Sequence, residues 1–411
     1  MKFGQVTRPN LLKITKFKIT VKNVIGYMEK VGVTNLIAFV IYLLDPFNKG
    51  YLFGYFLIIS MLFNGKKIIT YLDKDFIFIG LFSITYALFY IFYMESGLQF
   101  IFIYAFFPSF FYLFGKYLVI PNIKSGSLVL IFFTIGFIFS LSALTSIIIN
   151  LKEGGFSQLN REIPMFWSGK PMKATLMAAY LTFNMCIPII YIIKQKKNQL
   201  LINLIAGLIF IASLLSSFRL GSRTQLVICI LSIMISFIYV IPRQSFKANV
   251  KLFLIVLATS VLILKFIPLD LNASYLSVLG SRLQESGNVS SAGGRTTLWT
   301  NALENLFDYP LGWQGNNVRY AHNLWLDVAR YAGLIPFTLL MIFTFRSLRN
   351  TLKAIRKNSK ELLVNTTLIV FTLASMLIFF VEPIMEGLFF LFTVFCVFQG
   401  MINSYLKTHT V

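Results

Sequence analysis

The sequence is short of charged residues, of acidic residues above all, and of cysteine and histidine. Only 13% of its 411 residues are charged while 57% are hydrophobic, and no water-soluble fold can bury that much apolar material. The three cysteines all lie inside apolar stretches, which excludes a disulfide framework and the ligand spacing of a structural metal site. Alternation of polar and apolar residues at period two is also missing, which excludes a transmembrane β-barrel.

The apolar residues form repeated blocks close to the ~20 residues that a helix needs to cross a bilayer. We therefore expect an all-α polytopic membrane protein with about twelve transmembrane helices. The expected spans are 33–44, 51–64, 76–94, 98–115, 128–150, 172–193, 200–217, 225–241, 251–267, 322–345, 362–381 and 388–405.

Positive charge exceeds negative charge by a wide margin, with 37 Lys and Arg against 15 Asp and Glu. If the N-terminus lies inside and the spans alternate, about two thirds of these basic residues fall in short inside loops, the pattern that orients membrane helices. This is not the footprint of a nucleic-acid-binding surface, so we expect no nucleic-acid partner. Both termini are predicted to be cytoplasmic, with a basic segment at 1–30 that contains no cleavable signal peptide and a single transmembrane domain over 31–411.

Two long polar loops are expected on the outer side, at about 151–171 and 268–321. The second precedes the tenth span and is a long polar interruption in an otherwise membrane-like sequence. Apolar residues at helical spacing within it predict a short surface helix that begins near Arg295 and stops before Pro310. Such a loop is of little use to a transporter or an anchor, but it suits an enzyme that works at a membrane surface.

Arginines stand out on the outer side, because most other basic residues lie inside. Arg219 and Arg223 are four residues apart, so on one helix they would share a face and suit a diphosphate. Arg295 follows two glycines and lies near a helix start, where an anion is also favoured. The plainer alternatives are arginines that snorkel at a span boundary, and an Arg295 that pairs with Glu304 or Asp308.

His322 is the candidate general base, because a neutral imidazole can take a proton from a sugar hydroxyl near pH 7. Asn323 follows it, and Asp327 and Arg330 lie one and two turns into the next span at the spacing of an intrahelical ion pair. The plainer alternative is an interfacial histidine with a structural Asp–Arg pair behind it.

Two acidic residues, Glu382 and Glu386, flank Pro383 in the last outer loop. They could hold an acceptor sugar, assist a proton transfer, or pair with the outer arginines. The second histidine, His409, lies in the C-terminal tail and has no comparable context.

Several short motifs then follow one another in a definite order. They are Ser222-Arg223-Thr224, Arg295 followed by Trp299, Pro310-Leu311-Gly312-Trp313-Gln314-Gly315, His322-Asn323-Leu324-Trp325-Leu326-Asp327, and Ala332-Gly333-Leu334-Ile335-Pro336. With the twelve-span layout and the large late outer loop, this order resembles the O-antigen polymerase and O-antigen ligase superfamily of bacterial inner-membrane glycosyltransferases. The motifs are individually short and degenerate, but the resemblance covers most of the chain.

The resemblance implies a membrane-embedded glycosyltransferase that uses no cofactor or required metal and whose active face is periplasmic. Its donor would be an oligosaccharide on undecaprenyl diphosphate. Arg223 and Arg295 would then hold the diphosphate, and His322 would act as base on the acceptor hydroxyl or position it. The full set of expected site residues is His322 and Arg295 as catalytic residues, and Arg161, Arg219, Arg223, Asn323, Asp327 and Arg330 as substrate-binding residues.

Within the superfamily, the run from His322 to Pro336 is more like the polymerases, which extend a lipid-linked chain, than the ligases, which transfer the polymer to lipid A–core. The first outer loop with Arg161 also fits a polymerase, although its spacing to Gly169 is shorter than usual. A flippase is the main rival, but it should show repeat symmetry and charges in the middle of several spans. Expected partners are the lipid-linked oligosaccharide, the lipid bilayer and a chain-length-regulating membrane protein.

Overall fold

A computed structural model describes residues 25–63, 65–92, 97–120, 123, 125–156, 158, 160–193, 200–266, 273, 276–285, 295–313 and 320–408. Most of the basic N-terminal segment and much of the second outer loop fall outside these residues. The description that follows concerns the described residues alone.

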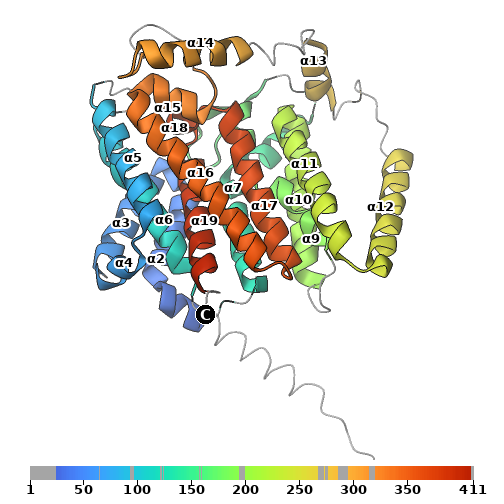
Figure 1. The fold of residues 1–411 in the computed structure, drawn as a ribbon. Helices are drawn as coiled ribbons and strands as arrows, with labels where there is room; N and C mark the ends of the chain where they lie inside the picture. The colour runs from blue at the N-terminus through green and yellow to red at the C-terminus, as the bar shows by residue number, and fades with distance from the viewer. Residues whose placement is uncertain are drawn as a thin grey trace, which may run out of the picture.

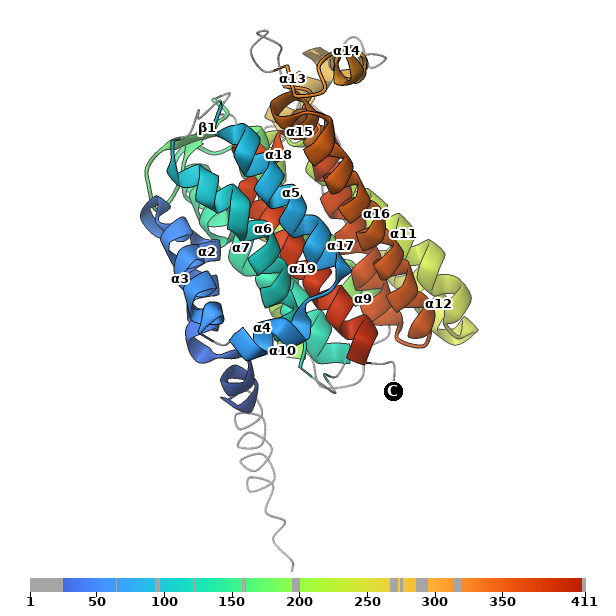
Figure 2. The same ribbon diagram turned by 60° about the vertical axis from the view of Figure 1, so that its left-hand side comes forward.

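Nearly all of the described chain is helical, and the helices run side by side as one bundle (Figures 1 and 2). The elements are α2 (Val33–Leu44), η1 (Pro46–Asn48), α3 (Gly50–Leu62), α4 (Gly65–Tyr71), α5 (Lys74–Tyr90), α6 (Gln99–Leu118), α7 (Ser125–Gly154), β1 (Glu162–Pro164), β2 (Pro171–Lys173), α8 (Ala174–Ala179), η2 (Asn184–Cys186), α9 (Ile189–Ile192), α10 (Leu200–Leu220), α11 (Arg223–Val240), η3 (Ile241–Arg243), α12 (Phe246–Phe266), α13 (Ser277–Glu285), α14 (Arg295–Asp308), α15 (Leu324–Ala332), α16 (Leu334–Lys357), α17 (Leu362–Val381), α18 (Ile384–Gly387) and α19 (Phe389–Thr408). The two short strands pair antiparallel, with Ile163 opposite Met172. The expected all-α class is confirmed.

Six of the described helices are long and apolar enough to cross a membrane. They are Gln99–Leu118, Ser125–Gly154, Leu200–Leu220, Arg223–Arg243, Leu362–Val381 and Phe389–Lys407. The bent pair Ile25–Val31 and Val33–Leu44, which turns by 85°, would make a seventh if it forms one span. Outer helices such as α10 expose large apolar side chains, which suits lipid as the surrounding solvent. The chain is an all-α, membrane-embedded protein.

The expected span at 172–193 is wrong as one continuous helix. The chain forms α8, then successive turns closed by bonds between residues three apart, and then α9. Asn184 lies in the middle, where its side-chain amide donates to the hydroxyls of Ser140 at 2.8 Å and Ser213 at 2.9 Å. Pro188 follows and cannot donate to a helix ladder. A buried polar residue and a proline therefore interrupt the helix inside an apolar block.

The expected span at 322–345 is also wrong as one helix, because it divides at Gly333 into α15 and α16. Gly333 has a φ of 77°, and a Cβ atom added there would lie 2.2 Å from the carbonyl oxygen of Pro310. Leu334 donates its backbone N–H to that same oxygen at 2.8 Å. Glycine is required at this position both for its left-handed backbone and for the close approach of the loop. At the other end of α15, Asn323 is the N-cap, so His322 lies outside the helix.

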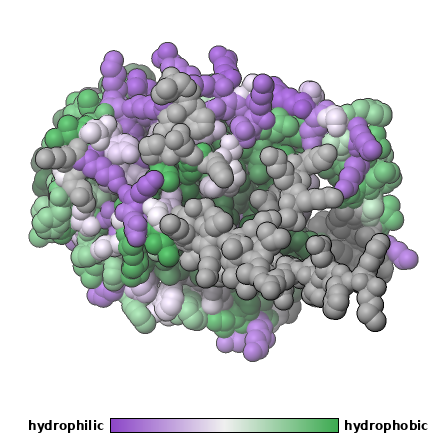
Figure 3. Space-filling view, turned by 90° about the horizontal axis from the view of Figure 1, so that it is seen from below, coloured by the Kyte–Doolittle hydropathy of each residue, from purple (hydrophilic) through white to green (hydrophobic). Residues whose placement is uncertain are grey.

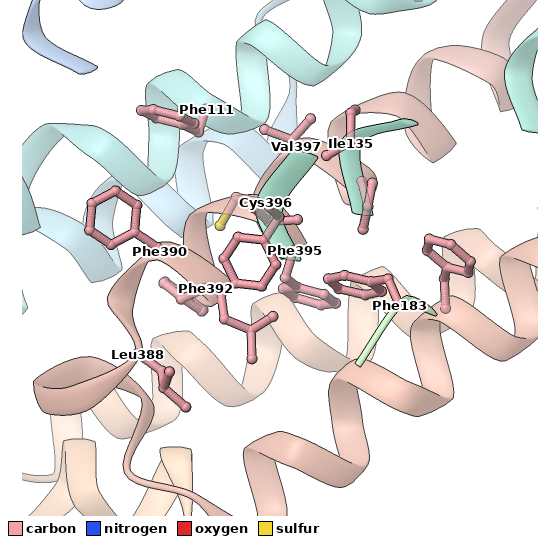
Figure 4. Close-up of a cluster of buried hydrophobic side chains, with 14 of the residues drawn as sticks. Phe111, Ile135, Phe183, Leu388, Phe390, Phe392, Phe395, Cys396 and Val397 are labelled. Carbon is pink, nitrogen blue, oxygen red and sulfur yellow. The ribbon is translucent and has the colours of Figure 1, made fainter. Parts of the chain in front are cut away.

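The core is formed around α19, which is almost wholly buried and packs against α6. Gly115 and Gly400 allow the two backbones to touch, since Cβ atoms there would lie about 2 Å from the carbonyl oxygens of Val397 and Tyr112. Phenylalanine side chains fill the remaining space around this contact, as Figure 4 shows. Because lipid tails are as apolar as these side chains, close packing rather than transfer from water stabilises the core.

The two ends of the bundle differ in what they carry. In Figure 1 the C-terminus and α4 lie at the lower end, while α14, α15 and α18 lie at the upper end. Figure 3 looks at the lower end and shows hydrophilic residues among apolar ones. Polar side chains from α5 and its N-cap, α6, α16 and α19 meet there in two sets, one around Asp73 and one around Asp75, which together we call the lower-end network. Its members are Asp73, Asp75, Lys116, Arg346, Asn350, Asn403 and Lys407.

Candidate functional site

α14 lies across the upper end of the bundle and carries Arg295 as its first residue (Figures 1 and 2). Ala302 and Leu306 are buried in a small cluster with residues of α15, and Trp299 packs against it. The indole N–H of Trp299 donates to the carbonyl oxygen of Ala321 at 2.9 Å. The predicted surface helix is therefore confirmed, and its tryptophan ties it to the segment that holds His322.

His322 lies in a tight loop whose backbone is strained. Its φ of 52° is left-handed, which costs a non-glycine residue about 1–2 kcal/mol. Asp327 holds the loop in this shape, because its carboxylate accepts from the backbone N–H of Ala321 at 2.7 Å and of Asn323 at 3.1 Å. Asn323 caps α15, because its side-chain oxygen accepts from the backbone N–H groups of Trp325 and Leu326 in the first turn, each at 3.2 Å.

Asp327 thus directs its carboxylate at the backbone on either side of His322, and Asn323 directs its amide oxygen at the first turn of α15. Their observed role is to fix the position of the imidazole. Asp327 also lies too deep to meet a saccharide directly, since its side chain is almost wholly buried. The sequence predicted both as substrate-binding residues, and in the structure they hold the loop that carries His322 and the start of the helix that follows it.

The imidazole of His322 is half-buried, and its Nδ1 is buried without a hydrogen-bond partner. Burial lowers the pKa of His322 from its ordinary value, and the positive charge of Arg295 lowers it further. Both effects disfavour the imidazolium form. At neutral pH the side chain is therefore neutral and able to accept a proton.

Arg295 faces Glu382, with 4.0 Å between guanidinium Nη2 and carboxylate Oε1. The distance is at the outer limit of an ion pair. The Arg295 side chain is 29% exposed, whereas Glu382 is buried. Glu382 directly follows α17, and its neighbour Pro383 turns the chain into α18. The alternative that Arg295 pairs with Glu304 or Asp308 is wrong in this structure, because both of those residues lie on the exposed face of α14.

Arg330 makes a second and tighter pair, donating from Nη2 to Oε1 of Glu386 at 2.8 Å. Its guanidinium also lies over the ring of Tyr320, 4.6 Å from the centroid. The expected intrahelical pair between Asp327 and Arg330 is therefore wrong. The alternative that the two glutamates pair with the outer arginines is confirmed for both pairs. Because Glu382 and Glu386 are four residues apart, they bring Arg295 and Arg330 to one part of the upper end.

Arg219 is fully buried and belongs to another set of contacts. It donates to the side-chain oxygens of Asn150 at 2.9 Å and Gln158 at 3.0 Å, and to the carbonyl oxygens of Gln158 at 3.1 Å and Asn160 at 3.0 Å. Arg161 donates twice to the carbonyl oxygen of Leu220 at 3.3 Å. These two arginines therefore attach the first outer loop to the end of α10.

Arg223 does not share a helix face with Arg219, so that expectation is wrong. α10 ends at Leu220, Gly221 takes a left-handed φ of 59°, and Arg223 begins α11. Its side chain is exposed. A glycine between two expected spans was the signal in the sequence that the helix would end before Arg223.

The structure brings Arg295, His322 and Glu382 together, and we call these three residues the upper-end cluster. The sequence named the first two as site residues and offered Glu382 only as one possible partner of the outer arginines. The signal in the sequence that could have identified Glu382 is its place at the end of an apolar block, next to a proline. Among the described residues, no group of three His, Cys, Asp or Glu side chains is suited to hold a metal ion.

The upper-end cluster combines a partly exposed cation, a neutral imidazole and a buried carboxylate. Such a set can bind an anionic group through the guanidinium and accept a proton through the imidazole. No family model and no curated protein matches this sequence.

Proposed function

We propose that the chain is a membrane-embedded glycosyltransferase of the O-antigen polymerase kind. It joins oligosaccharide repeat units linked to undecaprenyl diphosphate at the periplasmic face of a bacterial inner membrane. The observation that carries the proposal is the upper-end cluster: three distant segments bring a cation, a neutral imidazole and a carboxylate together at one end of an apolar bundle. The motif order between Arg223 and Pro336 supplies the substrate class.

The chemistry assigns one task to each group. The acceptor hydroxyl oxygen bonds to the anomeric carbon of the donor while the bond from that carbon to the diphosphate oxygen breaks. The electron pair leaves with the undecaprenyl diphosphate, whose charge is stabilised by Arg295 and, in this proposal, by Arg223. The hydroxyl proton passes to the neutral imidazole of His322. Glu382 holds Arg295 near the reacting groups before the donor arrives.

The proposed topology has twelve spans, with both termini in the cytoplasm. The C-terminus lies at the lower end, and the first described helix also begins there (Figure 2). The last turns of α16 at that end carry Arg356 and Lys357. Basic residues collect on the cytoplasmic side of inner-membrane proteins, so this arrangement supports a periplasmic upper end.

The decisive experiment is the polysaccharide ladder of a deletion strain complemented with variants. Loss of a polymerase leaves core with a single repeat unit, whereas loss of a ligase leaves bare core and accumulates lipid-linked polymer. We expect the single-repeat phenotype for the deletion and for His322→Ala and Arg295→Ala. Glu304→Ala, on the exposed face of the same helix as Arg295, is the matched control and should restore the full ladder.

Western detection of each variant in the membrane fraction separates loss of activity from loss of protein. An unchanged ladder with His322→Ala would contradict the catalytic assignment. Bare core with accumulated lipid-linked polymer in the deletion strain would instead favour the ligase, and bare core with accumulated lipid-linked single units would favour a flippase.

A further inference from the structure

α14 has an apolar stripe that nothing in the described chain covers. At 3.6 residues per turn, Leu303 and Phe307 lie on one stripe next to the buried stripe of Ala302 and Leu306. Leu303 is 51% exposed and Phe307 is 75% exposed. Leu311, which is 67% exposed, extends the stripe beyond the end of the helix.

The side of the same helix that faces away from α15 is polar. Glu304 and Asp308 are exposed there, and Asn301 lies beside them. The apolar face of α14 is therefore wider than the part of it that contacts α15. A helix on a water-exposed surface would not present a leucine and a phenylalanine in line without a partner.

The uncovered stripe continues into the surface that the spans present to lipid. Leu311 touches the start of α16, since a Cβ at Gly333 would lie 2.7 Å from the Cα of Leu311. Two residues further, Ile335 is exposed on α16. Near the other end of α14, Trp299 contacts the ring of Phe380, an exposed residue at the upper end of the span α17. The apolar surface thus passes from the spans onto α14 without a polar break at these two contacts.

α14 also has the orientation of a helix that lies on a membrane. Figures 1 and 2 show it across the upper end, transverse to α16 and α17. Helices that rest in the interfacial layer place their apolar face among the acyl chains and their polar face in water. The polar face here is acidic, so this face does not attract anionic lipid, and insertion of apolar side chains is what favours contact of α14 with the membrane.

We infer that α14 is an interfacial helix that inserts Leu303, Phe307 and Leu311 into the bilayer leaflet at the upper end. The partner is a lipid surface of ordinary composition, recognised through its acyl chains. Insertion at these positions keeps α14 at the depth of the lipid headgroups. Arg295, at the N-terminal end of this helix, is held at the same depth, where the diphosphate of a lipid-linked donor lies. This last consequence rests on the proposed function, whereas the membrane contact does not.

The contact is tested with the full chain in liposomes of phosphatidylethanolamine and phosphatidylglycerol. Phe307→Cys is labelled with an environment-sensitive fluorophore, and lipids with a nitroxide on the upper acyl chain act as quencher. Glu304→Cys, one turn away on the polar face, is the matched control. The native Cys186, Cys229 and Cys396 are buried, and the unsubstituted protein measures their background labelling.

We expect a blue-shifted emission and roughly threefold stronger lipid quenching at position 307 than at 304, with the reverse order for aqueous iodide. Leu303→Cys should behave like Phe307→Cys, so that a local disturbance at one position does not decide the result. Equal quenching at 304 and 307 overturns the inference. Protection of position 307 from both lipid nitroxide and iodide also overturns it, because protein would then cover the stripe.

A second readout separates this inference from the proposed function. Phe307→Asp should lower the yield of long polysaccharide by about tenfold, because a charge at this depth draws α14 out of the leaflet and moves Arg295. If the quenching pattern holds while His322→Ala leaves the ladder unchanged, the proposed function fails and the membrane contact stands. If polysaccharide depends on His322 but quenching is equal at both positions, the membrane contact fails alone.

Discussion

The lower-end network and the upper-end cluster contain the same kinds of side chains but in different states of pairing. Asp75 accepts from Arg346, from Asn350 at 2.6 Å and from Asn403 at 2.8 Å. Asp73 accepts from Lys116, among other donors, so both lower-end carboxylates are fully engaged. Buried polar groups that are satisfied in this way hold a structure in one arrangement.

The upper-end cluster differs in the contacts of its cation and its imidazole. Arg295 and Glu382 stand 4.0 Å apart, and Nδ1 of His322 is buried without a partner. A buried polar atom without a partner costs about 1–3 kcal/mol, so its presence in a well-packed protein calls for a reason. The comparison teaches that the lower-end carboxylates are each held by several donors, whereas the imidazole at the upper end keeps a ring nitrogen that no protein group occupies.

The largest effect is expected from removing the imidazole. His322→Ala should lower the rate of polymer formation by about 10²–10⁴-fold, because general base catalysis contributes that much. Purified protein in detergent with lipid-linked repeat units measures the rate, and the melting temperature should stay within a few degrees of the parent. A large fall in melting temperature would place His322 with the structural groups instead.

A substitution in the lower-end network should have the opposite effect, a loss of stability without a loss of rate per molecule. Asp75→Ala leaves the guanidinium of Arg346 and two amides without their acceptor, which should destabilise the protein by about 3 kcal/mol. Thermal unfolding and the yield of membrane-inserted protein measure this loss. The protein that does fold should retain its rate per molecule. A fall in rate without a fall in stability would show that the lower end takes part in the reaction.

A smaller effect is expected from loosening the His322 loop. Asp327→Asn keeps the size of the side chain but replaces one acceptor oxygen by a donor, so one of its two backbone bonds is lost. The value of kcat should fall by about tenfold to a hundredfold, because the imidazole is misplaced, while KM stays nearly unchanged. Asp327→Glu, which keeps both acceptors, should recover part of the rate. An effect confined to KM would indicate direct contact with substrate.

The smallest effect is a shift in the pKa of His322. The sequence contains two histidines, so His409→Gln leaves one imidazole whose titration can be followed by NMR. Burial and the charge of Arg295 both favour the neutral form, so His322 should titrate below the usual 6.5 and accept a proton at neutral pH. Arg295→Gln removes the second cause and should raise the pKa toward 6.5, while Arg295→Lys should keep it low. No change with Arg295→Gln would mean that the two side chains do not interact.

Much of the helical layout was predictable from the sequence. The expected spans 33–44 and 362–381 coincide with α2 and α17. Each is an unbroken apolar run between polar residues, and such a run defines where its helix begins and ends. The surface helix from Arg295 was also found, because the spacing of its buried residues is a local property of the chain. The two spans that divide, at 172–193 and 322–345, contain their own signals in Asn184, Pro188 and Gly333.

The site was predictable only in part. The sequence singled out Arg295 and His322 by their residue type and their place on the outer side. It did not predict that the donors of Arg219 are engaged by the first outer loop, or that the carboxylate of Asp327 holds the backbone around His322. Both roles depend on which carbonyl and amide groups lie within hydrogen-bond distance, and nothing in a local pattern of residues contains that information.

The sequence by itself determined that this protein is helical, that it lies in a membrane, and which segments form most of its helices, since these follow from hydrophobic runs and helical periodicity. Only the tertiary structure decided which charges meet. Arg330 and Glu386 are 56 positions apart, and Arg219 and Gln158 are 61 apart, yet each pair is in contact. Ion pairs and hydrogen bonds act over about 3–4 Å between side chains, so their partners are chosen by packing and not by order along the chain.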